Sequence, residues 1–286
     1  MDNRPIGFFD SGLGGLTCIP WLLGAFPGER IVYFGDTART PYGSKAPSTI
    51  RKFAAEITDF LIDAQGVKMV VIACNTVSAT ALDGLRARRP GTPILGIIGP
   101  AALTVARTCT NENRICVIGT KATIESEAYP KSILGFSPGL SVFGRACPAF
   151  VPLIEEGIIR SHVMDLTIEY YLDPFLREYR IDTLVLGCTH YPLIRNNLER
   201  LYPDIRIIDP SREILQAVAD ALGRGGLQAD AGAAPDGPAA PGAGHLFYAS
   251  DLSENFVNMI DTIFSGTGYP VTFSSFDLEK YLEHRG

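Results

Sequence analysis

Short apolar runs recur along the chain, and each run is bounded by Gly, Asp or Pro. Runs that stay apolar at every position are typical of strands buried on both faces of a parallel sheet, whereas half-exposed strands alternate apolar and polar residues. The pattern therefore predicts a series of buried parallel strands. They occupy residues 6–9, 31–35, 69–73, 94–98, 114–119, 140–144, 182–187 and 205–209, with a final pair near 245–249 and 270–273.

The segments between these runs have helical periodicity. In residues 48–66 the apolar positions recur every three or four residues, as expected of a helix with one face on a core. The positions on that face are Ile50, Phe53, Ala54, Ile57, Phe60 and Leu61. Because strand and helix alternate along the chain, we predict an α/β fold built from parallel sheets.

One pattern occurs twice. Residues 69–88 and 183–200 each contain an apolar strand, a cysteine at its carboxyl end and a helix, and the strands at 6–9 and 114–119 each end in a small polar turn. The repeat predicts two α/β domains related by pseudo-twofold symmetry. We expect residues 1–97 with 210–286 to form the first domain and 98–209 to form the second.

The segment 224–244 differs from the rest of the chain. It is rich in Ala, Gly and Pro and has no apolar periodicity, which predicts a flexible surface loop within the first domain.

Composition narrows the class of protein. The hydrophobic content of 46% over 286 residues can supply a full core, and the net charge of −6 without a basic stripe argues against nucleic acid as the primary partner. There is no basic and apolar leader at the N-terminus, and no apolar run approaches the roughly 20 residues of a membrane span. These features predict a globular cytoplasmic protein that does not contact membranes.

The six cysteines form no C-x-x-C pair and have no histidine at ligand spacing, so we expect reduced thiols and no metal. Cys74 and Cys188 each lie where a buried strand gives way to a helix. Helix N-termini favour a thiolate and lower a cysteine pKa from about 8.5. A single cysteine there is often only a small apolar residue, as Cys116 is expected to be, but two equivalent positions favour a chemical role.

Two symmetric bases suit a reaction that removes a proton from one face of a carbon and returns one to the other. This is the requirement of a racemase or epimerase. Segments 10–16 and 40–44 supply backbone N–H groups and hydroxyls suited to a carboxylate. The glycine run does not match a dinucleotide motif, because Thr17 occupies the last glycine position, and no P-loop sequence occurs.

Taken together, four motifs resemble those of the glutamate racemase family. They are D-S-G-L-G-G-L at 10–16, P-Y-G-S at 41–44, C-N-T at 74–76 and G-C-T-H-Y-P-L at 187–193. The resemblance implies an active site in the cleft between two α/β domains and interconversion of L- and D-glutamate without a cofactor. It also implies a supply of D-glutamate for bacterial peptidoglycan.

The resemblance assigns roles to individual residues. Cys74 is expected to act on the D-enantiomer and Cys188 on the L-enantiomer, with Asp10 and His190 as auxiliary groups. Glu155 matches the family's acidic position, although Glu156 is its neighbour. The residues expected to bind substrate are Asp10, Ser11, Pro41, Tyr42, Gly43, Ser44, Asn75, Thr76, Thr120, Thr189 and His190.

Two alternatives remain. An aspartate or hydantoin racemase would share the two thiols and differ in the pocket. A binding protein would hold an acidic ligand in the cleft and leave both thiols without a role. The sequence is compatible with a homodimer.

Overall fold

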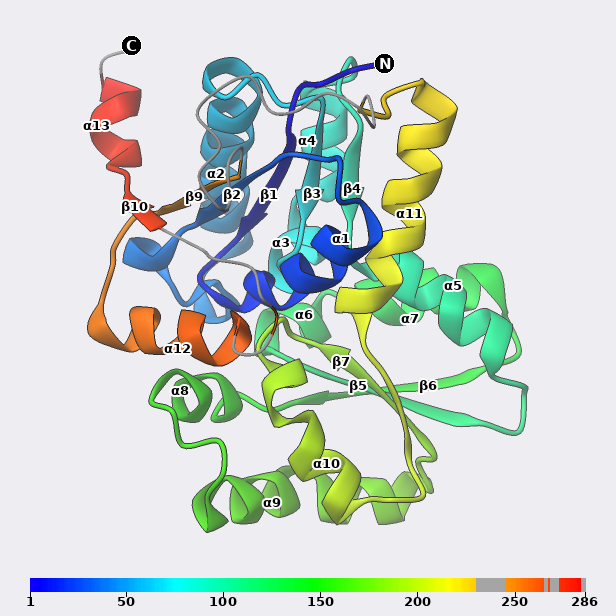
Figure 1. Cartoon of the computed structure of the whole chain (residues 1–286). Helices are drawn as coiled ribbons and strands as arrows, with labels where there is room; N and C mark the ends of the chain where they lie inside the picture. Colours follow the sequence, from blue (N-terminus) through cyan, green and yellow to red (C-terminus); the bar gives the residue numbers. More distant parts are fainter. Residues whose placement is uncertain (230–244, 265–266, 268–272, 284–286) are drawn as a thin grey trace.

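The chain forms two parallel sheets, shown in the upper and lower parts of Figure 1. The computed structural model describes residues 1–229, 245–264, 267 and 273–283. The strand order is β10-β9-β2-β1-β3-β4 in the first sheet and β6-β5-β7-β8 in the second. The strands are β1 Ile6–Asp10, β2 Ile31–Gly35, β3 Met69–Ile72, β4 Ile94–Gly96, β5 Arg114–Gly119, β6 Ser141–Ala146, β7 Thr183–Gly187, β8 Arg206–Ile208, β9 Leu246–Ala249 and β10 Phe273–Ser275.

The four consecutive strands of each half follow one order. In the first sheet β2-β1-β3-β4 lie side by side, and in the second β6-β5-β7-β8 repeat that arrangement, with every pair parallel. The predicted α/β class with two related parallel sheets is therefore confirmed. β9 and β10 return late in the sequence and extend the first sheet beyond β2.

Helices follow the strands. The α-helices are α1 Ile19–Ala25, α2 Pro47–Asp59, α3 Asn75–Thr80, α4 Leu82–Arg88, α5 Ile98–Thr108, α6 Lys121–Glu125, α7 Ala128–Phe136, α8 Phe150–Glu155, α9 His162–Tyr179, α10 Arg195–Leu201, α11 Pro210–Gly225, α12 Glu254–Phe264 and α13 Leu278–Glu283. Short 3-10 turns are η1 Gly14–Cys18, η2 Thr37–Arg39, η3 Tyr42–Ser44 and η5 Tyr191–Ile194, and η4 Phe60–Ala64 is a π-helical turn.

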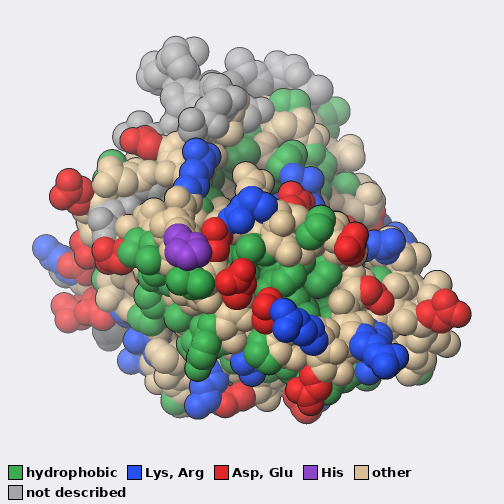
Figure 2. Space-filling view, turned by 90° about the horizontal axis from the view of Figure 1, so that it is seen from below, with side chains coloured by type: hydrophobic (Ala, Val, Ile, Leu, Met, Phe, Trp, Pro, Cys, Tyr) green, Lys and Arg blue, Asp and Glu red, His purple; other side chains and the backbone are tan. Residues whose placement is uncertain are grey.

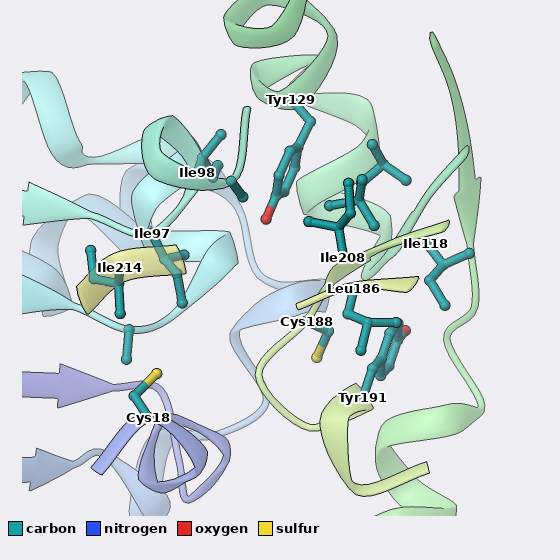
Figure 3. Close-up of a cluster of buried hydrophobic side chains, with 14 of the residues drawn as sticks. Cys18, Ile97, Ile98, Ile118, Tyr129, Leu186, Cys188, Tyr191, Ile208 and Ile214 are labelled. Carbon is teal, nitrogen blue, oxygen red and sulfur yellow. The ribbon is translucent and has the colours of Figure 1, made fainter. Parts of the chain in front are cut away.

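The two faces of the first sheet pack on different partners. Phe9 and the inward face of α2, with Ile50, Ala54 and Ile57, belong to one buried cluster. Successive strand residues point to opposite faces, and Phe8 belongs to a second cluster that continues into the other sheet. Figure 3 shows part of this second cluster, where Ile97 and Ile98 lie to one side of Tyr129 and Leu186 and Ile208 lie to the other. A continuous apolar core thus joins the two sheets.

The helix predicted over 48–66 is confirmed over most of its length: α2 continues directly into the π-helical turn η4, and Phe60 and Leu61 are buried as expected. Two other boundary predictions were wrong. The strand predicted over 94–98 ends at Gly96, because Ile98 is already the first residue of α5. Arg224 and Gly225 end α11 instead of opening a loop.

Part of the predicted loop, 230–244, and residues 270–272 of the last predicted strand lie outside the described residues. The domain boundaries near 97 and 210 remain a prediction. α11 packs against both α1 and α5 and so contacts elements on both sides of the first boundary.

The surface mixes charges of both signs. On the face seen in Figure 2, acidic and basic side chains are interspersed with apolar ones. Among the helices that the structure describes, none combines the length and the apolar character needed to cross a membrane.

Candidate active site

A cavity of about 300 Å³ lies where the carboxyl ends of the two sheets meet. Ligands commonly bind at this edge of open α/β sheets. The two cysteines singled out from the sequence both line it. The lining residues are Ser11, Thr40, Pro41, Tyr42, Gly43, Ser44, Cys74, Asn75, Thr76, Thr120, Lys121, Cys147, Pro148, Val151, Cys188, Thr189 and His190.

The two cysteines occupy equivalent positions in the two sheets. Ile72 pairs with Phe9 in the first sheet, Leu186 pairs with Ile118 in the second, and each cysteine follows two residues later. Both side chains are buried, with exposed fractions of 4% for Cys74 and 6% for Cys188. The structure therefore brings two thiols from different sheets to one small cavity.

Cys74 is surrounded by groups that favour its protonated form. Burial and the nearby negative charge of Asp10 raise the pKa of Cys74 to about 12. Its thiol lies 3.3 Å from Ser11 Oγ, and hydrogen bonds from Ser11 and the backbone act in the opposite direction without cancelling burial. The sequence prediction of a lowered pKa was therefore wrong for Cys74, because the start of α3 is enclosed by protein and faces a carboxylate.

Cys188 is beside a histidine. Its sulfur lies 3.9 Å from His190 Nδ1, and His190 Nε2 lies 3.0 Å from Glu155 Oε1. Burial alone would lower the pKa of His190, but the contacts with Cys188 and Glu155 outweigh it and raise that pKa to about 10. The ring is then a cation at neutral pH, held between the Cys188 sulfur and the Glu155 carboxylate.

The predicted acidic residues lie behind the lining of the cavity. Glu155 ends α8 and reaches the site through His190, while Glu156 lines a neighbouring cavity that Glu155 also borders. Asp10 is fully buried, and its carboxylate accepts hydrogen bonds from the Gly12 N–H at 3.0 Å and the Thr189 hydroxyl at 3.3 Å. Burial raises the pKa of Asp10.

Polar donors lie on the side of the cavity near α3 and α6. Thr76 Oγ1 is 3.0 Å from Thr120 Oγ1, and Asn75 Oδ1 accepts a hydrogen bond from Tyr129 Oη at 2.6 Å. Asn75 Nδ2 is buried and has no hydrogen-bond partner within the described part of the chain. An unpaired buried donor is costly, so the amide is suited to an acceptor on a bound ligand.

The loop at 40–44 is anchored by a residue that the sequence reading missed. Asp36 is buried and accepts hydrogen bonds from Tyr42 Oη, from Arg39 Nε at 2.8 Å and from Ser250 Oγ at 3.0 Å. Asp36 directly follows β2, and a polar residue at the carboxyl end of a buried strand was the available signal. The backbone at Gly43 packs against Thr120, where an added Cβ would lie 2.7 Å from the threonine.

Other lining residues were also missed. Thr40 belongs to the segment 40–44, Cys147, Pro148 and Val151 lie just before or within α8, and Lys121 places one cationic side chain at the cavity. Across the described residues, no three His, Cys, Asp or Glu side chains gather so as to hold a metal ion.

Comparisons with known proteins agree with the geometry. The family model for Asp/Glu/Hydantoin racemase matches residues 20–218 of this chain. A glutamate racemase of Geobacter metallireducens is 40% identical over 98% of this chain and 100% of its own length. One of Chlorobaculum tepidum is 45% identical over 94% of each chain.

Solved structures are similar over the same extent. The crystal structure of glutamate racemase from Francisella tularensis in complex with D-glutamate has a TM-score of 0.87 at 36% identity. That match covers 98% of this chain and 100% of the other.

Proposed function

This chain belongs to the Asp/Glu/hydantoin racemase family, and from that premise we propose that it interconverts L- and D-glutamate with Cys74 and Cys188 as opposed proton-transfer groups. One observation carries the proposal: the two thiols follow equivalent strands of related sheets and line a single cavity. Glutamate is the substrate that the names of the similar proteins support.

The reaction needs one sulfur charged and the other protonated. The thiolate takes the α-hydrogen of the bound amino acid as a proton, which leaves a carbanion, and the thiol on the opposite face gives its proton to the same carbon. The product has the inverted configuration. The two sulfurs have exchanged protonation states, so the resulting enzyme form acts on an amino acid of the product's configuration. Another turn on the original enantiomer requires protons to redistribute through solvent.

The residues of the site already distinguish the two sulfurs. Cys74, with a pKa raised to about 12, is a thiol at neutral pH, whereas Cys188 lies beside a cationic His190. A protonated Cys74 and a cationic His190 fit the direction in which Cys188, as the thiolate, removes a proton from L-glutamate and Cys74 donates one as the acid.

The reverse direction requires a thiolate at Cys74. The substrate itself supplies the missing cation, because its ammonium group enters a cavity where charges are poorly screened. A positive charge beside Cys74 favours ionisation of its thiol. We therefore propose that Cys74 becomes a base only when a substrate is bound.

The severe barrier of the reaction lies in the carbanion. Preorganised donors that hold the substrate carboxylate stabilise the developing charge more effectively in a closed site than in water. The groups suited to this are the unpaired amide of Asn75 and the hydroxyls of Thr76 and Thr120. The D-glutamate formed would serve bacterial peptidoglycan, as the family resemblance implies.

The test is turnover by the purified chain, followed by loss of optical rotation of L-glutamate and, separately, of L-aspartate. Cys74→Ala and Cys188→Ala should each lower racemisation by about a thousandfold or more, because general acid–base groups typically supply 10²–10⁴-fold. Cys109→Ala is the matched control, since Cys109 is also a buried free thiol but lies outside the cavity.

The outcomes separate the alternatives. Near-normal turnover in either cavity variant would contradict the two-thiol mechanism, and faster turnover of aspartate would identify a different substrate. If deuterium from heavy water enters the α-position of neither glutamate nor aspartate, the chain is a binding protein for an acidic ligand rather than a racemase of either amino acid.

A further inference from the structure

Three threonine hydroxyls meet at the edge of the cavity. Thr76 Oγ1 is 3.0 Å from Thr120 Oγ1 and 3.2 Å from Thr123 Oγ1, and the last two are 3.0 Å apart. Thr76 and Thr120 line the cavity, but Thr123 does not, and its exposed fraction is 1%. Thr123 therefore touches the two lining hydroxyls without reaching a ligand.

The triad joins the two halves of the molecule. Thr76 belongs to α3, which follows the first sheet, whereas Thr120 caps α6 and Thr123 lies within α6, which follows β5 of the second sheet. The backbone N–H of Thr123 also donates to Thr120 Oγ1 at 3.3 Å. The geometry of this corner is thus set by the first turn of α6.

The number of hydroxyl protons in the triad limits how many hydrogen bonds it can donate to a bound carboxylate. Each hydroxyl carries one proton, so in a ligand-free ring all three protons can be used within the triad. A bound carboxylate accepts strong charge-assisted hydrogen bonds and draws the protons of Thr76 and Thr120 toward itself. The oxygen of Thr120 keeps the Thr123 N–H as a donor, and only the Thr123 hydroxyl is left to donate to Thr76.

We propose that Thr123 is a positioning residue that directs the hydroxyl protons of Thr76 and Thr120 toward a carboxylate of the substrate. The inference rests on the proposed function, because it assumes an amino-acid dicarboxylate in the cavity. Without the Thr123 hydroxyl, Thr76 and Thr120 satisfy each other across their 3.0 Å contact. One of the two hydroxyl protons is then used between the threonines and can no longer be donated to the ligand.

Thr123→Val tests this because it keeps the branched shape and removes only the hydroxyl. We expect the dissociation constant of D-glutamate, measured by calorimetry, to rise about tenfold or more, which is the usual effect of losing a hydrogen bond to a charged group. KM should rise in parallel. Thr123→Ser, which retains the hydroxyl, should restore both values to within about threefold of the unmodified chain.

Thr58→Val is the matched control. Thr58 is also fully buried, and its hydroxyl has no partner among the residues described, so the same change of side chain should leave D-glutamate binding unaltered. A purely structural role for Thr123 would lower the melting temperature and the fraction of active protein while KM stayed constant.

Two failures can be told apart. If the unmodified chain does not racemise glutamate, the proposed function fails, and the role of Thr123 is still read from calorimetry. Unchanged binding in Thr123→Val, no binding of D-glutamate by the unmodified chain, or equal weakening in Thr123→Val and Thr123→Ser would overturn the inference.

Discussion

Cys74 and Cys188 occupy like positions but have unlike neighbours. The sulfur of Cys74 faces Ser11 with Asp10 nearby, and that of Cys188 faces His190, which in turn contacts Glu155. The difference is one of charge: an anionic group near one sulfur and a cationic ring near the other. At the scale of single residues, the site is therefore asymmetric even though the strands that support it are not.

The protonation of His190 should be visible in the stability of the fold. Its pKa is raised to about 10 in the folded chain from an unfolded value near 6.5. Because the folded state binds this proton more tightly, the stabilisation is complete below about pH 6.5 and is lost as pH rises through about 10. Unfolding by urea between pH 6 and pH 10 should show the unmodified chain losing more stability than His190→Asn.

A control isolates this effect. His162 lies on the surface at the start of α9, so His162→Asn should follow the pH dependence of the unmodified chain. Parallel stability curves for His190→Asn and the unmodified chain would show that His190 is not charged in the folded state.

At the scale of elements, turns from the two halves pack closely enough to require glycine. A Cβ at Gly14 would lie 2.4 Å from Thr189 Oγ1, and one at Gly43 would lie 2.7 Å from Thr120 Cβ. These contacts lie between η1 and the segment after β7, and between η3 and the start of α6. The polar motifs at 10–16 and 40–44 thus form contacts between the two halves and also contribute residues to the lining of the cavity.

Gly43→Ala should separate η3 from α6. The neighbouring Thr120 is β-branched and stiff, so relief must come from backbone movement, with an expected loss of about 1–3 kcal/mol in stability. We expect kcat/KM to fall about tenfold or more, measured with L-glutamate. Gly84→Ala in α4, where an added Cβ meets no atom within 4 Å, should leave kcat/KM unchanged.

The strands were predictable because burial on both faces leaves an uninterrupted apolar signal. The prediction for 94–98 was wrong only at its end. Apolar residues such as Ile97 and Ile98 are expected both at the end of a buried strand and at the start of a buried helix. Most cavity residues followed from motifs at strand ends, whereas Lys121, Cys147, Pro148 and Val151 did not. The pKa of Cys74 and the role of Thr123 did not, because both depend on which side chains from distant segments enclose them.

At the scale of the whole molecule, hydrogen bonds cross from one half to the other around the cavity. Tyr129 of α7 donates to Asn75, Thr189 donates to Asp10, and Thr17 Oγ1 lies 3.3 Å from the carbonyl of Thr189. The apolar cluster shown in Figure 3 supports the same junction. We propose the division into 1–97 with 210–286 and 98–209 on this basis, with the cavity at the boundary.

Tyr129→Phe tests one of these bonds. The change leaves Asn75 Oδ1 buried and without its donor, which should cost about 1–3 kcal/mol in the free energy of unfolding. Because Asn75 then loses its fixed orientation in the cavity, kcat/KM should also fall several-fold. Chemical denaturation and racemisation of L-glutamate measure the two effects.

Tyr202→Phe is the comparison for this variant. Tyr202 Oη donates to Asp173 at 2.7 Å away from the cavity, so its loss should lower stability without lowering kcat/KM. Equal kinetic effects in the two variants would argue against a specific role for the Tyr129 bond.

The unlike charges around the two sulfurs have a consequence for kinetics. The enantiomers of an amino acid have the same free energy in water, so the equilibrium constant between them is one, and kcat/KM in the two directions must be equal for a racemase. The Asp10 and His190 surroundings therefore cannot make the enzyme a better catalyst for one enantiomer. They can only change kcat and KM together. A lower KM and a lower kcat in one direction are then matched by a higher KM and a higher kcat in the other.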